Sequence, residues 1–131
     1  MNKRKVEEYL PRALEGLANP KCNIRKKDKN DKFLNQIEKN FRGQISSFGA
    51  AVTMGSFKAA VAFFGQKGSA EVDRSELLRL INYVVNNDWE TADKIVTNIL
   101  GLADSDVPGV QEQYLNASVA IKLAMNAFEL V

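Results

Sequence analysis

Basic side chains are concentrated in the first half of the chain, where they could contact the phosphates of a polyanion. Residues 1–67 hold 14 of the 18 basic residues and 6 of the 16 acids, a net charge of +8, whereas residues 68–131 have a net charge of −6. Such a chain can offer its basic end to a polyanion and its acidic end to a basic neighbour. Ordinary solvation of a charged surface is the alternative interpretation of the same pattern.

The densest basic segment is residues 21–32, which contains six Lys or Arg residues and few apolar ones. We expect residues 21–31 to form an exposed loop. A helix over residues 31–52 should follow, and at about 100° per residue Lys32, Lys39 and Arg42 fall within an arc of roughly 80° opposite its apolar face. Glu38 is the only acid in the interior of this helix, so neighbouring charges do not neutralise the basic face.

These residues are the predicted phosphate contacts, and contacts of this kind position a protein without reading sequence. Phe33 and Phe41 are expected near the packed face rather than between the basic residues, so we do not predict base stacking. The predicted nucleic-acid-binding residues are Arg25, Lys26, Lys27, Lys29, Lys32, Lys39 and Arg42.

Side chains that commonly carry catalysis are scarce. The chain has no histidine and one cysteine, Cys22, so it offers no Ser-His or Cys-His pair, no histidine base and no zinc site of the usual kinds. The acids near Asp88 are those that a helix start favours, and Asp104 and Asp106 lack a third ligand at a recognisable spacing. We expect no enzymatic activity, cofactor, metal or small-molecule substrate. A metal-dependent enzyme that uses Asp88 or Asp104 is the alternative.

One long apolar stretch, residues 44–64, should organise the fold. About 20 apolar residues can span a bilayer, but this stretch contains Lys58, several hydroxyl side chains and glycines, so we do not expect a membrane span. It is expected to form two helices that meet at a bend near Gly55. Bending or close helix packing would explain Gly43, Gly49 and Gly55.

Apolar residues at three- and four-residue spacings predict an all-α bundle of about six helices in a single domain, residues 1–131, with a bent central apolar helix pair. No segment shows the alternation typical of a strand. Two apolar stripes on the last helix predict burial on both sides, in the core or against a partner subunit. The expected helices are residues 5–18, 31–52, 56–64, 73–86, 88–100 and 108–131.

Several residues should set the helix ends. Asp73 with Glu76 resembles a capping box, and Asp88 is expected to cap the fifth helix. Asn86 with Asn87, and Gly101 further on, should end helices, and Pro108 suits the first turn of the last one. Pro11 should kink the first helix or delay its start.

The surroundings of the chain are predicted from its single cysteine and its first residues. Cys22 cannot form a disulfide within the chain, and the N-terminal segment is amphipathic rather than apolar, unlike a signal peptide. We therefore expect a cytoplasmic protein in a reducing environment.

The central stretch also resembles a known family. Phe41, Ile45, Phe48, Val52 and Gly55, followed by the sequence FKAAVAFF, are similar to the central signature of the small subunit of the Cmr-type (type III-B) CRISPR effector complex. The resemblance extends over the whole chain by helix order, and its motifs are mostly core residues. The C-terminal part of the chain also resembles the last helix of that family, at Tyr114, Ala117, Ile121, Lys122 and Leu123.

Two departures separate the chain from this family pattern. Gly49 stands where a proline is expected before the bend, and residues 123–126 read LAMN where the last helix often carries a tryptophan and a basic pair. The first departure bears on the geometry of the bend, and the second on any RNA contact by the C-terminal helix.

The resemblance implies a non-catalytic helical subunit that stacks on copies of itself and on other subunits along guide RNA and target RNA. It would touch the RNA backbone and take part in antiviral defence, while cleavage belongs to other subunits. Two alternatives stay open: the related type III-A small subunit, and an α-helical protein–protein adaptor that binds no nucleic acid.

Overall fold

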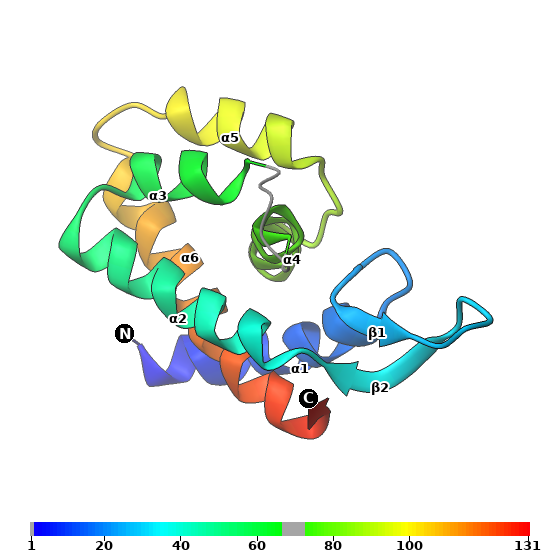
Figure 1. Cartoon of the computed structure of the whole chain (residues 1–131). Helices are drawn as coiled ribbons and strands as arrows, with labels where there is room; N and C mark the ends of the chain where they lie inside the picture. The colour runs from blue at the N-terminus through cyan, green and yellow to red at the C-terminus, as the bar shows by residue number, and fades with distance from the viewer. Residues whose placement is uncertain (1, 67–72) are drawn as a thin grey trace.

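Six helices and a small three-stranded sheet make up the part of the chain that the computed structural model describes, residues 2–66 and 73–131 (Figure 1). The all-α class is confirmed, with the sheet as an addition at one side of the helices. The helices are α1 (Lys3–Ala18), α2 (Lys39–Met54), α3 (Phe57–Phe64), α4 (Arg74–Asn86), α5 (Ala92–Leu100) and α6 (Val107–Ala124). The strands are β1 (Arg25–Lys27), β2 (Phe33–Ile37) and β3 (Glu129–Leu130).

Helix α6 lies at the centre, because α1, α2 and α4 all pack against it. Its buried face is built largely from small side chains, including Ala117, Ala120 and Ala124, which let the neighbouring helices approach closely. Two larger side chains, Tyr114 and Ile121, are buried among them, and Tyr114 packs edge-on against Phe57 of α3 at a centroid distance of 5.3 Å. Helices α3 and α5 lie side by side and cover the other side of α4 (Figure 1).

The bend between α2 and α3 is confirmed. Gly55 ends α2, and the Ser56 side chain accepts a hydrogen bond from the Ala59 N–H and so begins α3. Close packing does not explain Gly43 and Gly49, because a Cβ atom added at either position would meet nothing within 4 Å. The expectation of tight contact at these two positions is therefore wrong.

The predicted helix over residues 31–52 is wrong in its first third. Residues 33–37 form β2 instead, Glu38 is extended, and α2 begins only at Lys39. The spacing of Leu34 and Ile37 suits either a helix or a short strand, and periodicity alone cannot distinguish the two over five residues. Two partners make these residues a strand: β1 pairs with β2 in antiparallel orientation, and β3 pairs with it in parallel and places Gln36 opposite Glu129.

The same pairing corrects the C-terminal prediction. Helix α6 ends at Ala124 rather than at residue 131, and a 3-10 turn, Met125–Ala127, leads into β3. Two backbone hydrogen bonds hold the C-terminal residue against β2 and the start of α2. The Val131 N–H donates to the Ile37 carbonyl at 2.9 Å, and the Lys39 N–H donates to the Val131 carbonyl at 3.0 Å. Residues 21–31 likewise do not form a loop throughout, since they contain β1.

Most of the predicted helix ends are confirmed. Asn87 caps α4 in the left-handed conformation with a φ of 56°, Gly101 ends α5, and Pro108 lies in the first turn of α6. Thr91 rather than Asp88 caps α5, which therefore begins three residues later than predicted from a cap at Asp88. The sequence also predicts a turn at residues 65–68 from its two glycines, and residues 67 and 68 lie outside the described residues.

The structure also decides two further expectations about helix starts. Helix α1 begins at Lys3 and continues through Pro11, so of the two effects predicted for the proline, a kink or a delayed start, the delayed start is excluded. Asp73 caps α4 by accepting a bond from the Ser75 N–H, but Glu76 does not complete a capping box, because its carboxylate binds Arg79 and the Asn23 N–H.

Lys58 has a structural role in the apolar helix α3. Its Nζ donates to the carbonyl oxygens of Leu100 at 3.1 Å and Leu102 at 2.8 Å, at the C-terminal end of α5. A cation at this end of a helix also interacts favourably with the helix dipole. Among the described helices, none is long and apolar enough to cross a membrane.

Candidate nucleic-acid interface

Strands β1 and β2 form an antiparallel hairpin that projects from one side of the helices (Figure 1). The Asp28 N–H donates to the Lys32 carbonyl at 2.8 Å and closes a three-residue loop. In this type of hairpin the last loop residue adopts the left-handed conformation, and Asp31 does so with a φ of 62°. The Asp28 carboxylate also accepts bonds from the N–H groups of Asn30 at 2.8 Å and Lys32 at 3.0 Å.

The hairpin tip, which we define as residues 28–32, is thus held by its own hydrogen bonds. Asp28 satisfies two backbone donors of the loop, so bonds within the tip favour this loop shape. Lys29 and Lys32 are exposed on it. An ordered tip loses little conformational freedom when it binds a ligand.

Two of the predicted contact residues instead pack against an aromatic ring of the hairpin. The Arg25 guanidinium lies 4.6 Å from the centroid of the Phe33 ring, and the Lys27 ammonium lies 4.9 Å from it. Arg25 also donates to the Ala18 carbonyl at 2.6 Å, and Lys27 pairs with Asp31 at 3.5 Å. These contacts tie β1 to α1 and to the hairpin tip.

Lys39 and Arg42 lie in the first turn of α2, beside the C-terminal segment. Lys39 is exposed. Arg42 is half-buried, and its guanidinium donates to the side-chain oxygen of Asn126. Lys32 does not share a helix face with them, because it precedes β2, so the predicted basic face on one continuous helix is wrong.

The structure therefore divides the seven predicted residues into two groups. Arg25, Lys27 and Arg42 have side-chain partners within the protein. The other four are exposed and, within residues 2–66 and 73–131, have no side-chain partner. We call Lys26, Lys29, Lys32 and Lys39 the free lysines.

The acids near the tip do not neutralise the free lysines directly. Asp28 accepts the two backbone bonds of the loop, and Asp31 pairs with Lys27. Each free ammonium group can donate up to three hydrogen bonds and carries a full charge, as phosphate binding requires. The arrangement suits contact with a flexible polyanion.

Sequence reasoning missed the hairpin that carries three of the free lysines. A signal was available: the Asp, Asn and Lys residues between RKK and FLNQI form a turn sequence flanked by two short segments. The loop interpretation used the polar composition but did not consider that residues 33–37 could be a strand.

Neither of the other candidate sites gains support. Burial raises the pKa of the Cys22 thiol to about 12, which disfavours the reactive thiolate. Among the described residues, no group of three or more His, Cys, Asp or Glu side chains could hold a metal ion. Glu90, one of the clustered acids, pairs with Lys94 at 3.6 Å.

No protein-family model matches the chain, and the comparisons found no similar curated protein or solved structure. A functional proposal therefore has to start from the residues and geometry described above.

Proposed function

We propose that this protein is a non-catalytic RNA-binding subunit that contacts the phosphate backbone through its free lysines. The observation that carries this proposal is the projecting hairpin, whose ordered tip exposes Lys29 and Lys32 while the adjacent acids have partners within the hairpin. Lys26 lies on β1 of the same hairpin, and Lys39 lies at the start of the helix that follows β2.

The assembly that we propose is the type III-B (Cmr-type) CRISPR effector complex, as the sequence resemblance implies. Its partners would be guide RNA, target RNA, other subunits and copies of the same chain, in the cytoplasm. The confirmed bend at Gly55 and the all-α class are compatible with that resemblance. Phosphate contacts suit this role because a subunit placed along any guide must not read its sequence.

The residues with internal partners would act indirectly. Arg25 and Lys27 pack on Phe33 and so hold the hairpin in shape, while Arg42 ties α2 to the C-terminal segment. Their loss is expected to weaken RNA binding by disturbing the position of the free lysines. The salt dependence of binding separates the two roles, because it reports the number of phosphates neutralised.

The test compares the RNA binding of two triple variants, one that removes three lysine charges on the hairpin and one that removes three lysine charges elsewhere. The hairpin variant is Lys26→Gln, Lys29→Gln and Lys32→Gln; the control is Lys3→Gln, Lys94→Gln and Lys122→Gln, with the same change in net charge. Binding to single-stranded RNA of mixed sequence is measured by fluorescence anisotropy over a salt series. Each phosphate contact on a single strand contributes about 0.7 to the log–log slope, so the hairpin variant should lose about 2 units.

Equal affinity and equal salt slope in the hairpin variant and the control would refute the proposed RNA interface. Circular dichroism and urea unfolding of both variants establish that they are folded. RNAs of different sequence should bind with similar affinity, since backbone contacts carry no sequence information.

The assembly itself is tested by purifying the tagged chain from its native cells at moderate salt. Short RNAs of discrete length with several larger proteins would support the CRISPR complex. Proteins without RNA would support the adaptor alternative. One observation favours that alternative: the outer face of α2 is free of charge after Arg42, and Met54 at its end is 88% exposed.

A further inference from the structure

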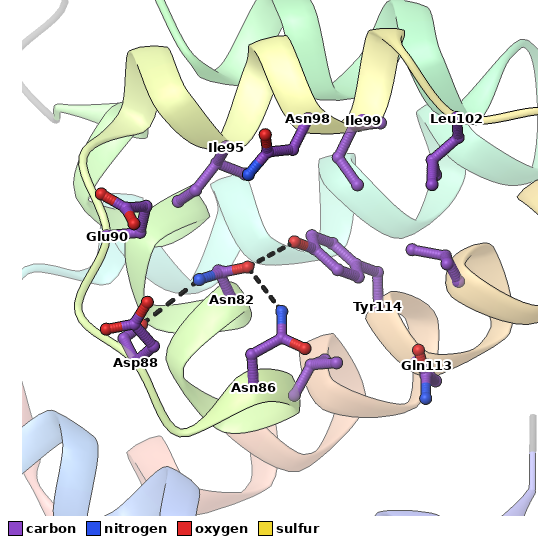
Figure 2. A pocket seen from close by; sticks show the side chains of 12 residues that line it. Asn82, Asn86, Asp88, Glu90, Ile95, Asn98, Ile99, Leu102, Gln113 and Tyr114 are labelled. Atoms are coloured by element: carbon purple, nitrogen blue, oxygen red, sulfur yellow. Dashed lines mark hydrogen bonds between the residues drawn. The ribbon is translucent and has the colours of Figure 1, made fainter.

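A cavity of about 330 Å³ lies between α4, α5 and α6 (Figure 2), and no residue of the β1–β2 hairpin lines it. Its volume is at the lower end of the range for small-molecule sites, roughly 300–1,000 Å³. Apolar side chains of α5, α6 and the segment between them form part of the wall. These are Ile95, Ile99, Leu102 and Val110.

The polar part of the wall is organised by Asn82. Its Nδ2 donates to the Asp88 backbone carbonyl at 3.2 Å, and since a carbonyl can only accept, this bond fixes the orientation of the amide. The Asn82 Oδ1 then accepts from the Tyr114 hydroxyl and from the Asn86 Nδ2, each at 2.7 Å. Figure 2 shows Tyr114 and Asn86 both directed at the Asn82 side chain.

This network leaves the cavity wall with unused acceptors. The Tyr114 proton and one Asn86 amide proton are committed to Asn82, so the Tyr114 oxygen and the Asn86 Oδ1 are left to accept. The Asp88 carboxylate adds a negative charge to the lining. Within the part of the chain that the structure describes, no residue donates to any of these three groups.

We propose that this cavity binds a small organic cation, a protonated amine or guanidinium on a short aliphatic body. The cationic group would donate to Asp88, Asn86 and the Tyr114 oxygen, and the aliphatic body would contact Ile95 and Ile99. The ligand undergoes no reaction. This inference is independent of the proposed RNA interface, which lies on other residues.

Charge and hydrogen bonding both select against other ligand classes. An anion would face the carboxylates of Asp88 and Glu90 at close range. Glu90 is partly satisfied, since it accepts from the Thr91 N–H at 3.1 Å and pairs with Lys94 at 3.6 Å, which leaves Asp88 as the main charge for a ligand. A neutral alcohol could donate only one hydrogen bond, whereas an ammonium group could donate to Asp88, Asn86 and Tyr114 together. The amides of Asn98 and Gln113 also line the cavity, and because they can both donate and accept, they do not select for charge.

The experiment is an NMR titration of the full ¹⁵N-labelled chain with butylammonium, and with butanol and butyrate as the neutral and anionic controls. Butylammonium should produce saturable shifts of the side-chain amides of Asn82 and Asn86. In the series ethyl-, propyl- and butylammonium, affinity should rise by up to about fourfold per methylene, the gain expected for its burial.

Two variants locate the site, and a third controls for charge. Asp88→Asn should weaken butylammonium binding about fivefold or more, as expected for a lost charge about 4 Å from the ligand. Val110→Phe should fill part of the cavity and weaken every member of the series. Asp104→Asn, an acid outside the cavity with the same charge change, should leave binding unaltered.

Three results would each overturn the proposal. They are the absence of saturable shifts with butylammonium, equal affinity for butanol and butylammonium, and an Asp88→Asn effect no larger than that of Asp104→Asn. The Asp88 side chain is exposed, so its variant is expected to fold even if Val110→Phe does not.

Discussion

Replacing Lys58 by methionine should destabilise the protein far more than loss of an ordinary surface lysine. Methionine keeps most of the length and the apolar body of the side chain but removes the ammonium group. The two bonds to the carbonyls of Leu100 and Leu102 are then lost, together with a cation at the C-terminal end of α5. The carbonyls must find water or remain without a donor.

The size of the effect follows from the environment of these carbonyls. Hydrogen bonds to charged groups contribute about 1.5–3 kcal/mol each when both partners are buried. Leu100 is 48% exposed, so water can replace part of the contact at its carbonyl. We therefore expect a loss of about 1–3 kcal/mol in the free energy of unfolding, which for this chain length lowers Tm by roughly 4–11 °C.

Urea unfolding followed by tryptophan fluorescence suits this measurement. Trp89, the only tryptophan, stacks on Tyr83 at a centroid distance of 4.2 Å and reports on the connection between α4 and α5. The matched control is Lys94→Met on α5, whose ammonium group is exposed and whose ion pair with Glu90 should contribute no more than about 0.5–1 kcal/mol. If Lys58→Met costs no more than this control, Lys58 does not stabilise the end of α5.

Other variants test packing, the hairpin and burial. Gly49→Ala should raise the free energy of unfolding by about 0.5–1 kcal/mol, because alanine favours a helix interior more than glycine does. Gly16→Ala should lower it by about 1–3 kcal/mol, because the new Cβ would lie 2.7 Å from a methyl group of Leu80. Urea unfolding measures both changes. Asp28→Ala should speed hydrogen exchange of the two loop amides and weaken RNA binding while global stability changes little. Burial raises the Cys22 pKa from 9.0 to about 12, so unfolding above pH 9 releases a proton. Stability should then fall by up to about 1.4 kcal/mol per pH unit. Cys22→Ala should reduce this slope, and the part that remains should come from Tyr83 and Tyr114, whose pKa values are also raised in the folded protein.

Each of these expectations has a contrary result. Equal stability changes for the two glycine variants would contradict the packing difference between α1 and α2. Unaltered amide exchange in Asp28→Ala would mean that the carboxylate does not hold the tip. A pH dependence that Cys22→Ala leaves intact would have to come from another group.

The helices could be predicted from the sequence because each carries its own apolar pattern and its own end signals. Asn87, Gly101 and Pro108 act through local backbone geometry, so their roles are readable without knowledge of the fold. Lys58 shows the limit of such reasoning. The sequence places it in an apolar helix, but its partners, the carbonyls of residues 100 and 102, depend on how α3 meets α5.

The candidate interface was predicted in composition but not in geometry. All seven basic residues stood out by charge, yet only contacts across the chain show that Arg25 and Lys27 share Phe33 and that Arg42 bonds Asn126. β2 was missed because its identity as a strand depends on pairing, with β1 on one side and with residues near the C-terminus on the other. Local periodicity cannot report such pairing.

The pairing of β2 with β3 also affects how the protein can fold while it is being synthesised on the ribosome. Gln36 bonds Glu129, 93 residues further along the chain. At a synthesis rate of about 5–20 residues per second, roughly 5–20 s pass between the synthesis of β2 and the synthesis of β3. A two-stranded hairpin alone is marginally stable in water. The proposed RNA-binding tip would therefore gain its full support only after the C-terminal strand has emerged, so a nascent chain would be slow to capture RNA before its helices have assembled.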